Sequence, residues 1–126
     1  VTLPHGIGMA IGGMYPKVMH GEALAITYPR FAEFTWRTAV PRFAVLARIL
    51  NPDLARTNDM DAAGKCPAEI ERFLKRIGMS LRLSDFDVPE SELPALTDRC
   101  FVLPDYKSNP RVADRKDMLS IIEGIY

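Results

Sequence analysis

The opening stretch, residues 1–25, reads VTLPHGIGMAIGGMYPKVMHGEALA and sets the architecture of the chain. Small and apolar residues recur at helical spacing on both sides of a break at residues 12–16, which holds two glycines and a proline. The pattern therefore predicts a helix, a turn and a second helix. His5 and His20, the two histidines of the chain, lie one on each side of that turn.

The spacing of the two histidines decides whether they can share a metal ion. On one unbroken helix they would be about 22 Å apart, whereas each imidazole must approach a metal to about 2.1 Å. The turn at residues 12–16 removes this obstacle, because it lets two helices bring His5 and His20 face to face. Zinc or iron(II) takes at least three protein ligands, so two histidines form half of a site. The alternative interpretation is two incidental histidines in a helical protein.

The composition is that of a globular protein with a balanced charge. The chain has 126 residues, of which 48% are hydrophobic and 25% charged, and its formal net charge is zero. These values fit one domain, residues 1–126, and exclude the basic surface that binds nucleic acid or an anionic membrane. No apolar run is long enough to span a bilayer, and no secretory signal is recognisable. Cys66 and Cys100 lack the spacing of a zinc site or a disulfide framework, which indicates two free thiols in a cytoplasmic protein.

Helical spacing of apolar residues continues over the rest of the chain, and no strand-like alternation interrupts it. Pro29 should kink or interrupt the helix that starts at His20, and Asp114 should cap the last helix. The sequence thus predicts an all-α, multi-helix bundle with short loops. The predicted helices cover residues 20–39, 41–50, 67–77, 87 or 89 to about 100, and 114 onward, with polar connections at 51–65 and 104–111.

Residues 4–34, PHGIGMAIGGMYPKVMHGEALAITYPRFAEF, resemble the metal-ligand segment of the iron-containing alcohol dehydrogenases. Members of that family carry a histidine in a small-residue helix, a His-Gly step after a turn, and a proline further along the second helix. His5, His20-Gly21 and Pro29 stand in that arrangement. The stretches ERFLKRIGMSLRLSDFDVPESELPALTDRC and NPRVADRKDMLSIIEGIY are similar to later parts of the same family, so the likeness covers nearly the whole chain.

The resemblance implies that residues 1–126 form a dehydroquinate synthase-like C-terminal helical domain of a two-domain enzyme. In such enzymes an N-terminal domain binds NAD(P), and one Asp and three His hold Fe2+ or Zn2+ between the domains. By position, His5 and His20 match the last two His ligands, and the other ligands and the cofactor loop would lie upstream. The implied reaction interconverts a small-molecule alcohol and its aldehyde by hydride transfer. The implied enzyme is a homo-oligomer, a dimer, and this chain by itself would be inactive.

The sequence departs from the family pattern at Met9, where many members have a further histidine near the nicotinamide. Met9 lies one helical turn after His5, so it should line the substrate pocket or pack in the core. Residues 20–25, HGEALA, also resemble the HGEAVA of dehydroquinate synthases, which leaves the related synthase or glycerol dehydrogenase type as an alternative. A non-catalytic helical interaction module is a second alternative, in which the histidines need not converge. Residues 1–18 are expected to expose an apolar face that the cofactor domain would cover.

Overall fold

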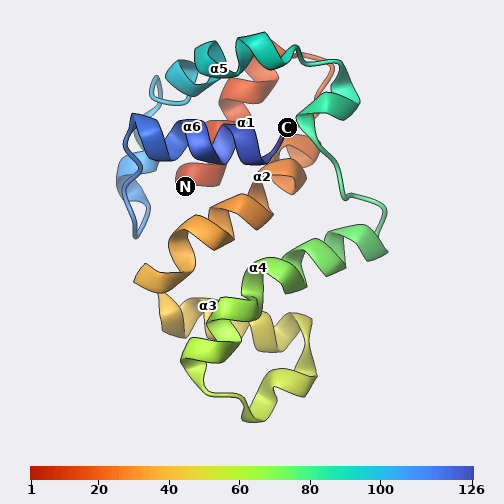
Figure 1. Ribbon diagram of the computed structural model, residues 1–126, viewed down its shortest axis with the longest axis vertical. Helices are drawn as coiled ribbons and strands as arrows, with labels where there is room; N and C mark the ends of the chain where they lie inside the picture. The colour runs from red at the N-terminus through yellow and green to blue at the C-terminus, as the bar shows by residue number, and fades with distance from the viewer.

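The computed structural model describes all 126 residues and contains helices and turns but no β-strand. The predicted all-α fold is therefore confirmed, and no helix combines the length and hydrophobicity needed to cross a bilayer. Six α-helices follow one another (Figure 1): α1 Leu3–Met14, α2 His20–Thr35, α3 Val40–Leu50, α4 Asp59–Arg76, α5 Leu93–Arg99 and α6 Arg115–Gly124. Short 3-10 turns lie between them: η1 Trp36–Thr38, η2 Pro52–Arg56, η3 Leu83–Phe86, η4 Glu90–Glu92 and η5 Pro104–Ser108.

The helices form two groups, each around its own apolar core, and α2 contributes to both (Figure 1). The larger core lies among α1, the first half of α2, α5 and α6. The smaller core lies between α3 and α4, and Ala32 near the end of α2 belongs to it. Phe31 packs against both cores, so α2 joins the two groups. The larger core includes the fully buried side chains of Leu3, Ile7, Ile11, Leu96, Met118 and Ile122.

Helix α4 begins at Asp59, whereas the sequence predicts a polar connection up to residue 65 and a helix from Pro67. Asn58 caps α4, because its side-chain oxygen accepts a hydrogen bond from the backbone N–H of Asp61 at 2.9 Å. The small side chains at 62, 63 and 66 are fully buried against α3, and this packing holds the first half of α4 helical. Pro67 consequently lies inside the helix, where it removes one backbone hydrogen bond without ending it.

Helix α2 likewise continues through Pro29, so the predicted break is absent, and the predicted kink stays a prediction. Ile26 on one side of the proline and Ala32 on the other are buried in the two cores, and this burial keeps both halves in place. The helix ends at Thr35 and continues as the turn η1, so it is shorter than predicted. The predicted bounds of α3 are confirmed, and so is the predicted cap of α6 by Asp114.

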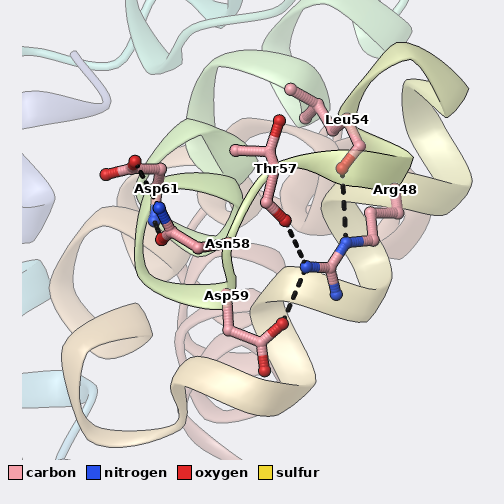
Figure 2. Close-up of polar contacts among 6 residues, drawn as sticks. All are labelled: Arg48, Leu54, Thr57, Asn58, Asp59 and Asp61. Carbon is pink, nitrogen blue, oxygen red and sulfur yellow. Dashed lines mark hydrogen bonds and ion pairs between the residues drawn. The ribbon is translucent and has the colours of Figure 1, made fainter.

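Arg48 fixes the connection between α3 and α4, as Figure 2 shows. Its Nη2 donates a hydrogen bond to the backbone carbonyl of Thr57 at 2.6 Å and pairs with Oδ1 of Asp59 at 2.7 Å. Its Nε lies 3.4 Å from the carbonyl oxygen of Leu54 in η2. One guanidinium therefore holds the end of η2 and the start of α4 against α3.

The apolar face expected at residues 1–18 is covered for the most part, so that prediction is wrong. Leu3, Ile7 and Ile11 are buried, and the large apolar side chains that remain exposed in this range are Val1 (82%) and Met9 (47%). Segments from the far end of the chain, α5 and η5, lie against α1 and contribute to this cover. The sequence around α1 cannot reveal this cover, because the covering segments lie far away in the chain.

Candidate metal centre

The turn between α1 and α2 folds the two histidines together, as the sequence predicts. The backbone N–H of Tyr15 closes α1 on the carbonyl of Ile11 at 2.7 Å. The Glu22 carboxylate then caps the start of α2 by accepting a hydrogen bond from the backbone N–H of Met19 at 2.9 Å. His5 and His20 consequently face each other with ring centroids 5.4 Å apart and ring planes inclined by 78°.

This separation fits two imidazoles bound to one tetrahedral ion. The centre of an imidazole ring lies about 3.2 Å from a metal that it binds, because the bond is about 2.1 Å long and the nitrogen lies about 1.1 Å from the ring centre. Two such rings at the tetrahedral angle have centres about 5.2 Å apart. Edge-to-face aromatic pairs commonly have the same separation, so this distance fits both arrangements. The hydrogen-bond partners of the ring nitrogens give further information.

Asp105 lies against one of the two ring nitrogens of His5. Its Oδ2 lies 2.6 Å from Nδ1 of His5, although the two residues are 100 positions apart in the chain. An ionised carboxylate only accepts hydrogen bonds, so the tautomer of His5 that suits this contact is the one with its proton on Nδ1. Nε2 of neutral His5 then carries a free lone pair, which is what a metal ion binds. The sequence predicts a loop at residues 104–111 and gives no sign that Asp105 reaches His5.

Two glycines of α1 make room for the partners of His5. A Cβ atom added at Gly6 would lie 3.2 Å from Cβ of Asp105. A Cβ atom added at Gly8 would lie 3.2 Å from Cε1 and 3.3 Å from Nδ1 of His20. These contacts would be shorter than ordinary van der Waals contacts. The absence of side chains at Gly6 and Gly8 therefore lets η5 and α2 approach α1 this closely.

Exposure differs among the three side chains singled out from the sequence. The side chain of His5 is 36% exposed, and His20 lies on the surface at the start of α2. Met9 is 47% exposed, so it does not pack in the core. Its predicted place in a substrate pocket stays a prediction. A hollow of the surface lies elsewhere, lined mainly by residues of α2 and α4, and none of these three side chains lines it.

The histidine pair by itself does not complete a metal site. No group of three or more His, Cys, Asp or Glu side chains is placed to hold a metal ion. His5 and His20 fit two ligands by their separation, and Asp105 is engaged with Nδ1 of His5. A zinc or iron site needs at least one more protein ligand. The two imidazoles therefore fall short of the number of donors that such a site requires.

The profile of the Fe-containing alcohol dehydrogenase family, C-terminal part, matches residues 1–126. The chain belongs to the iron-containing alcohol dehydrogenase family. The NAD-dependent methanol dehydrogenase of Bacillus methanolicus is 29% identical to this chain over 122 residues. The 1,3-propanediol dehydrogenase of Klebsiella pneumoniae is 27% identical over 122 residues. Each alignment covers 97% of this chain, but only 32% and 31% of the respective relative.

Solved structures support the same assignment of the fold. A 1,3-propanediol oxidoreductase superposes over 100% of this chain and 33% of its own, with a TM-score of 0.91 and 25% sequence identity. An alcohol dehydrogenase from Oenococcus oeni gives a TM-score of 0.89 with the same coverage and 22% identity. The chain thus has the fold of an iron-containing alcohol dehydrogenase C-terminal domain, and it spans about a third of the length of these relatives.

Proposed function

We propose that this chain is the metal-binding helical domain of an NAD(P)-dependent alcohol dehydrogenase, and that His5 and His20 are two ligands of its Fe2+ or Zn2+ ion. The observation that carries the proposal is the convergence of the two imidazoles, 5.4 Å apart, from two different helices. An interaction module has no need of such convergence. Membership of the iron-containing alcohol dehydrogenase family favours this function over the dehydroquinate synthase type.

The side chains of this domain have distinct tasks in the proposed enzyme. His5 would offer Nε2, because Asp105 lies against Nδ1, and His20, packed beside Gly8, would offer the second nitrogen from the facing ring. A divalent ion held by these side chains would supply Lewis-acid chemistry at the oxygen of an alcohol or aldehyde, and a bound nicotinamide would supply the hydride chemistry. Met9 is exposed one turn after His5, and its flexible apolar side chain suits a wall of the substrate pocket.

We further propose that the cofactor domain and the remaining ligands, one Asp and one His, belong to sequence upstream of Val1, and that the whole enzyme is a cytoplasmic dimer. The share of the relatives that this chain covers, about a third, supports the two-domain proposal. The reading frame upstream of Val1 tests it. We expect a Gly-rich nucleotide loop and an Asp-x-x-x-His pair there, and a frame that encodes neither contradicts the proposal.

Metal titration of the 126-residue chain tests the two ligands directly. Because two ligands form half of a site, we expect a dissociation constant for Fe2+, measured without oxygen, above about 1 μM. We also expect no NAD-dependent alcohol oxidation by the chain alone. The residual binding should be lost in His5→Ala and in His20→Ala and kept in Asp98→Ala, which changes an exposed carboxylate paired with Arg115. Binding that survives both histidine substitutions contradicts the ligand assignment, and tighter binding contradicts the half-site.

A further inference from the structure

We infer that Asp105 is a positioning residue that holds His5 in the tautomer with its proton on Nδ1 and thereby presents Nε2 to the metal ion. The inference rests on the proposed function, because it describes how one of the two proposed ligands is oriented. It adds to the site a residue from η5, a segment that the histidine motif of α1 and α2 does not include.

The contact between Asp105 and His5 has the features of a strong hydrogen bond. The distance from Oδ2 to Nδ1 is 2.6 Å, and a hydrogen bond to an ionised acceptor is both shorter and stronger than a neutral one. The side chain of Asp105 is 12% exposed, so little water competes for its oxygen atoms. A bond of this kind fixes the ring rotation as well as the position of the proton.

Asp105 has no other partner that would account for its position. Its side chain makes one hydrogen bond, to His5, and it forms no ion pair with an arginine or lysine. The neighbouring cation, Lys107, lies over the ring of Tyr106 instead, with its Nζ 5.8 Å from the ring centroid. A largely buried carboxylate without a cationic partner is costly, and the imidazole N–H offsets part of that cost.

The segment around Asp105 is held in place from two sides. Tyr106 makes an edge-to-face contact with Phe101, with ring centroids 4.8 Å apart, and both rings pack against the larger core. On the other side, Gly6 lets Cβ of Asp105 approach the backbone of α1. The carboxylate is therefore fixed before any metal arrives. Carboxylates that orient a histidine ligand in this way are common around metal ions and typically affect metal affinity by about 10-fold to 100-fold.

Nitrogen NMR of the 126-residue chain tests the tautomer. The chain is labelled with 15N in its two histidines and recorded without metal in mildly alkaline solution, where imidazole is neutral. We expect His5 to show a protonated Nδ1 and an unprotonated Nε2. In Asp105→Ala the proton should move to Nε2 to a large extent, and Asp105→Asn should give an intermediate result because its amide oxygen still accepts a hydrogen bond. The control Asp98→Ala should leave the tautomer of His5 unchanged.

Titration with Zn2+ then connects the tautomer to metal binding. We expect the added ion to shift Nε2 of His5 and not Nδ1, and Asp105→Ala to raise the dissociation constant about 10-fold or more. A wild-type His5 with its proton on Nε2, or a tautomer unaffected by Asp105→Ala in a chain that remains folded by circular dichroism, overturns the inference. Neither result affects the proposed ligand pair, which fails if Zn2+ binding is indifferent to His5→Ala and His20→Ala.

Discussion

Gly8 lies against the imidazole of His20, so close that a Cβ atom on Gly8 would be 3.2 Å from Cε1 of that ring. The glycine belongs to α1 and the histidine to α2. The gap between the two helices is therefore set by the absence of a side chain at one position. A substitution at Gly8 should therefore change the geometry of the histidine pair without unfolding α1. Its effects on stability and on metal binding can be measured separately.

The variant Gly8→Ala should displace His20 while leaving the domain folded. Alanine favours the helix by up to about 1 kcal/mol relative to glycine, which offsets the crowding. We expect an unchanged or slightly raised melting temperature, together with Zn2+ binding weakened about tenfold because the ring of His20 has to move. Calorimetry and the NMR titration of the histidines measure the two effects.

Gly13→Ala is the matched control, because it also lies in α1 but has nothing within 4 Å of an added Cβ atom. It should raise the melting temperature without any change in Zn2+ binding. If Gly8→Ala and Gly13→Ala affect zinc equally, the close contact between Gly8 and His20 has no role in the site.

Tyr15 and Glu92 predict a loss of stability at high pH. Burial, the hydrogen bond at 2.7 Å from the Tyr15 hydroxyl to Glu92 and the charge of Glu92 raise the pKa of Tyr15 to about 12. The folded chain thus holds the phenol proton more tightly than the unfolded chain, whose tyrosines titrate near pH 10. This contribution to stability is complete below about pH 10 and is lost as the pH rises towards 12.

The variant Glu92→Gln should lower the pKa of Tyr15 but leave it above the usual value for tyrosine, because the effect of burial remains. The difference in tyrosinate absorbance between the chain and its Tyr15→Phe variant reports this pKa. Glu90→Gln, a change in the same turn η4 at a residue that is exposed, is the control and should have no effect. A pKa of Tyr15 that stays the same without the Glu92 charge would show that burial alone is responsible.

The two cysteines should be inert in the folded chain. Burial raises the pKa of the Cys100 thiol to about 12, and burial followed by the charge of Glu69 raises that of Cys66 to about 11. Only the thiolate reacts with disulfide reagents, and both thiols are also shielded from solvent. We expect no reaction with a colorimetric disulfide reagent near pH 8 and two equivalents in denaturant. Rapid reaction of either thiol in the folded chain contradicts the burial described above.

Arg48→Ala should destabilise the group formed by α3 and α4. The side chain of Arg48 is 27% exposed. Its guanidinium donates a hydrogen bond to the carbonyl of Thr57 and pairs with the carboxylate of Asp59, as Figure 2 shows. Its loss leaves these acceptors without their partner, at a cost of about 1–2 kcal/mol in the free energy of unfolding. Urea denaturation measures the change. Arg42→Ala, on the same helix but exposed and without a side-chain hydrogen bond, should change stability by less than about 0.5 kcal/mol.

The sequence alone determined the helical class of the domain and the convergence of its histidines. The spacing of apolar residues is a local property, and it predicted α3 correctly. The residue type at position 114 is also local, and it predicted the cap of α6. The two glycines and the proline between His5 and His20 are equally local, and they predicted the turn that brings the rings to 5.4 Å. A resemblance in the same segment identified the family that the comparison of the whole chain confirmed.

Only the tertiary structure decided that α2 and α4 continue through Pro29 and Pro67, that α1 is covered, and that Asp105 meets His5. In α2 and α4, burial against neighbouring helices outweighs the local cost of an interior proline, and the sequence pattern shows that cost but not the burial. The cover of α1 and the Asp105–His5 hydrogen bond join segments from opposite ends of the chain. Such contacts depend on how helices pack in three dimensions, and the spacing of residues along one helix carries no information about them.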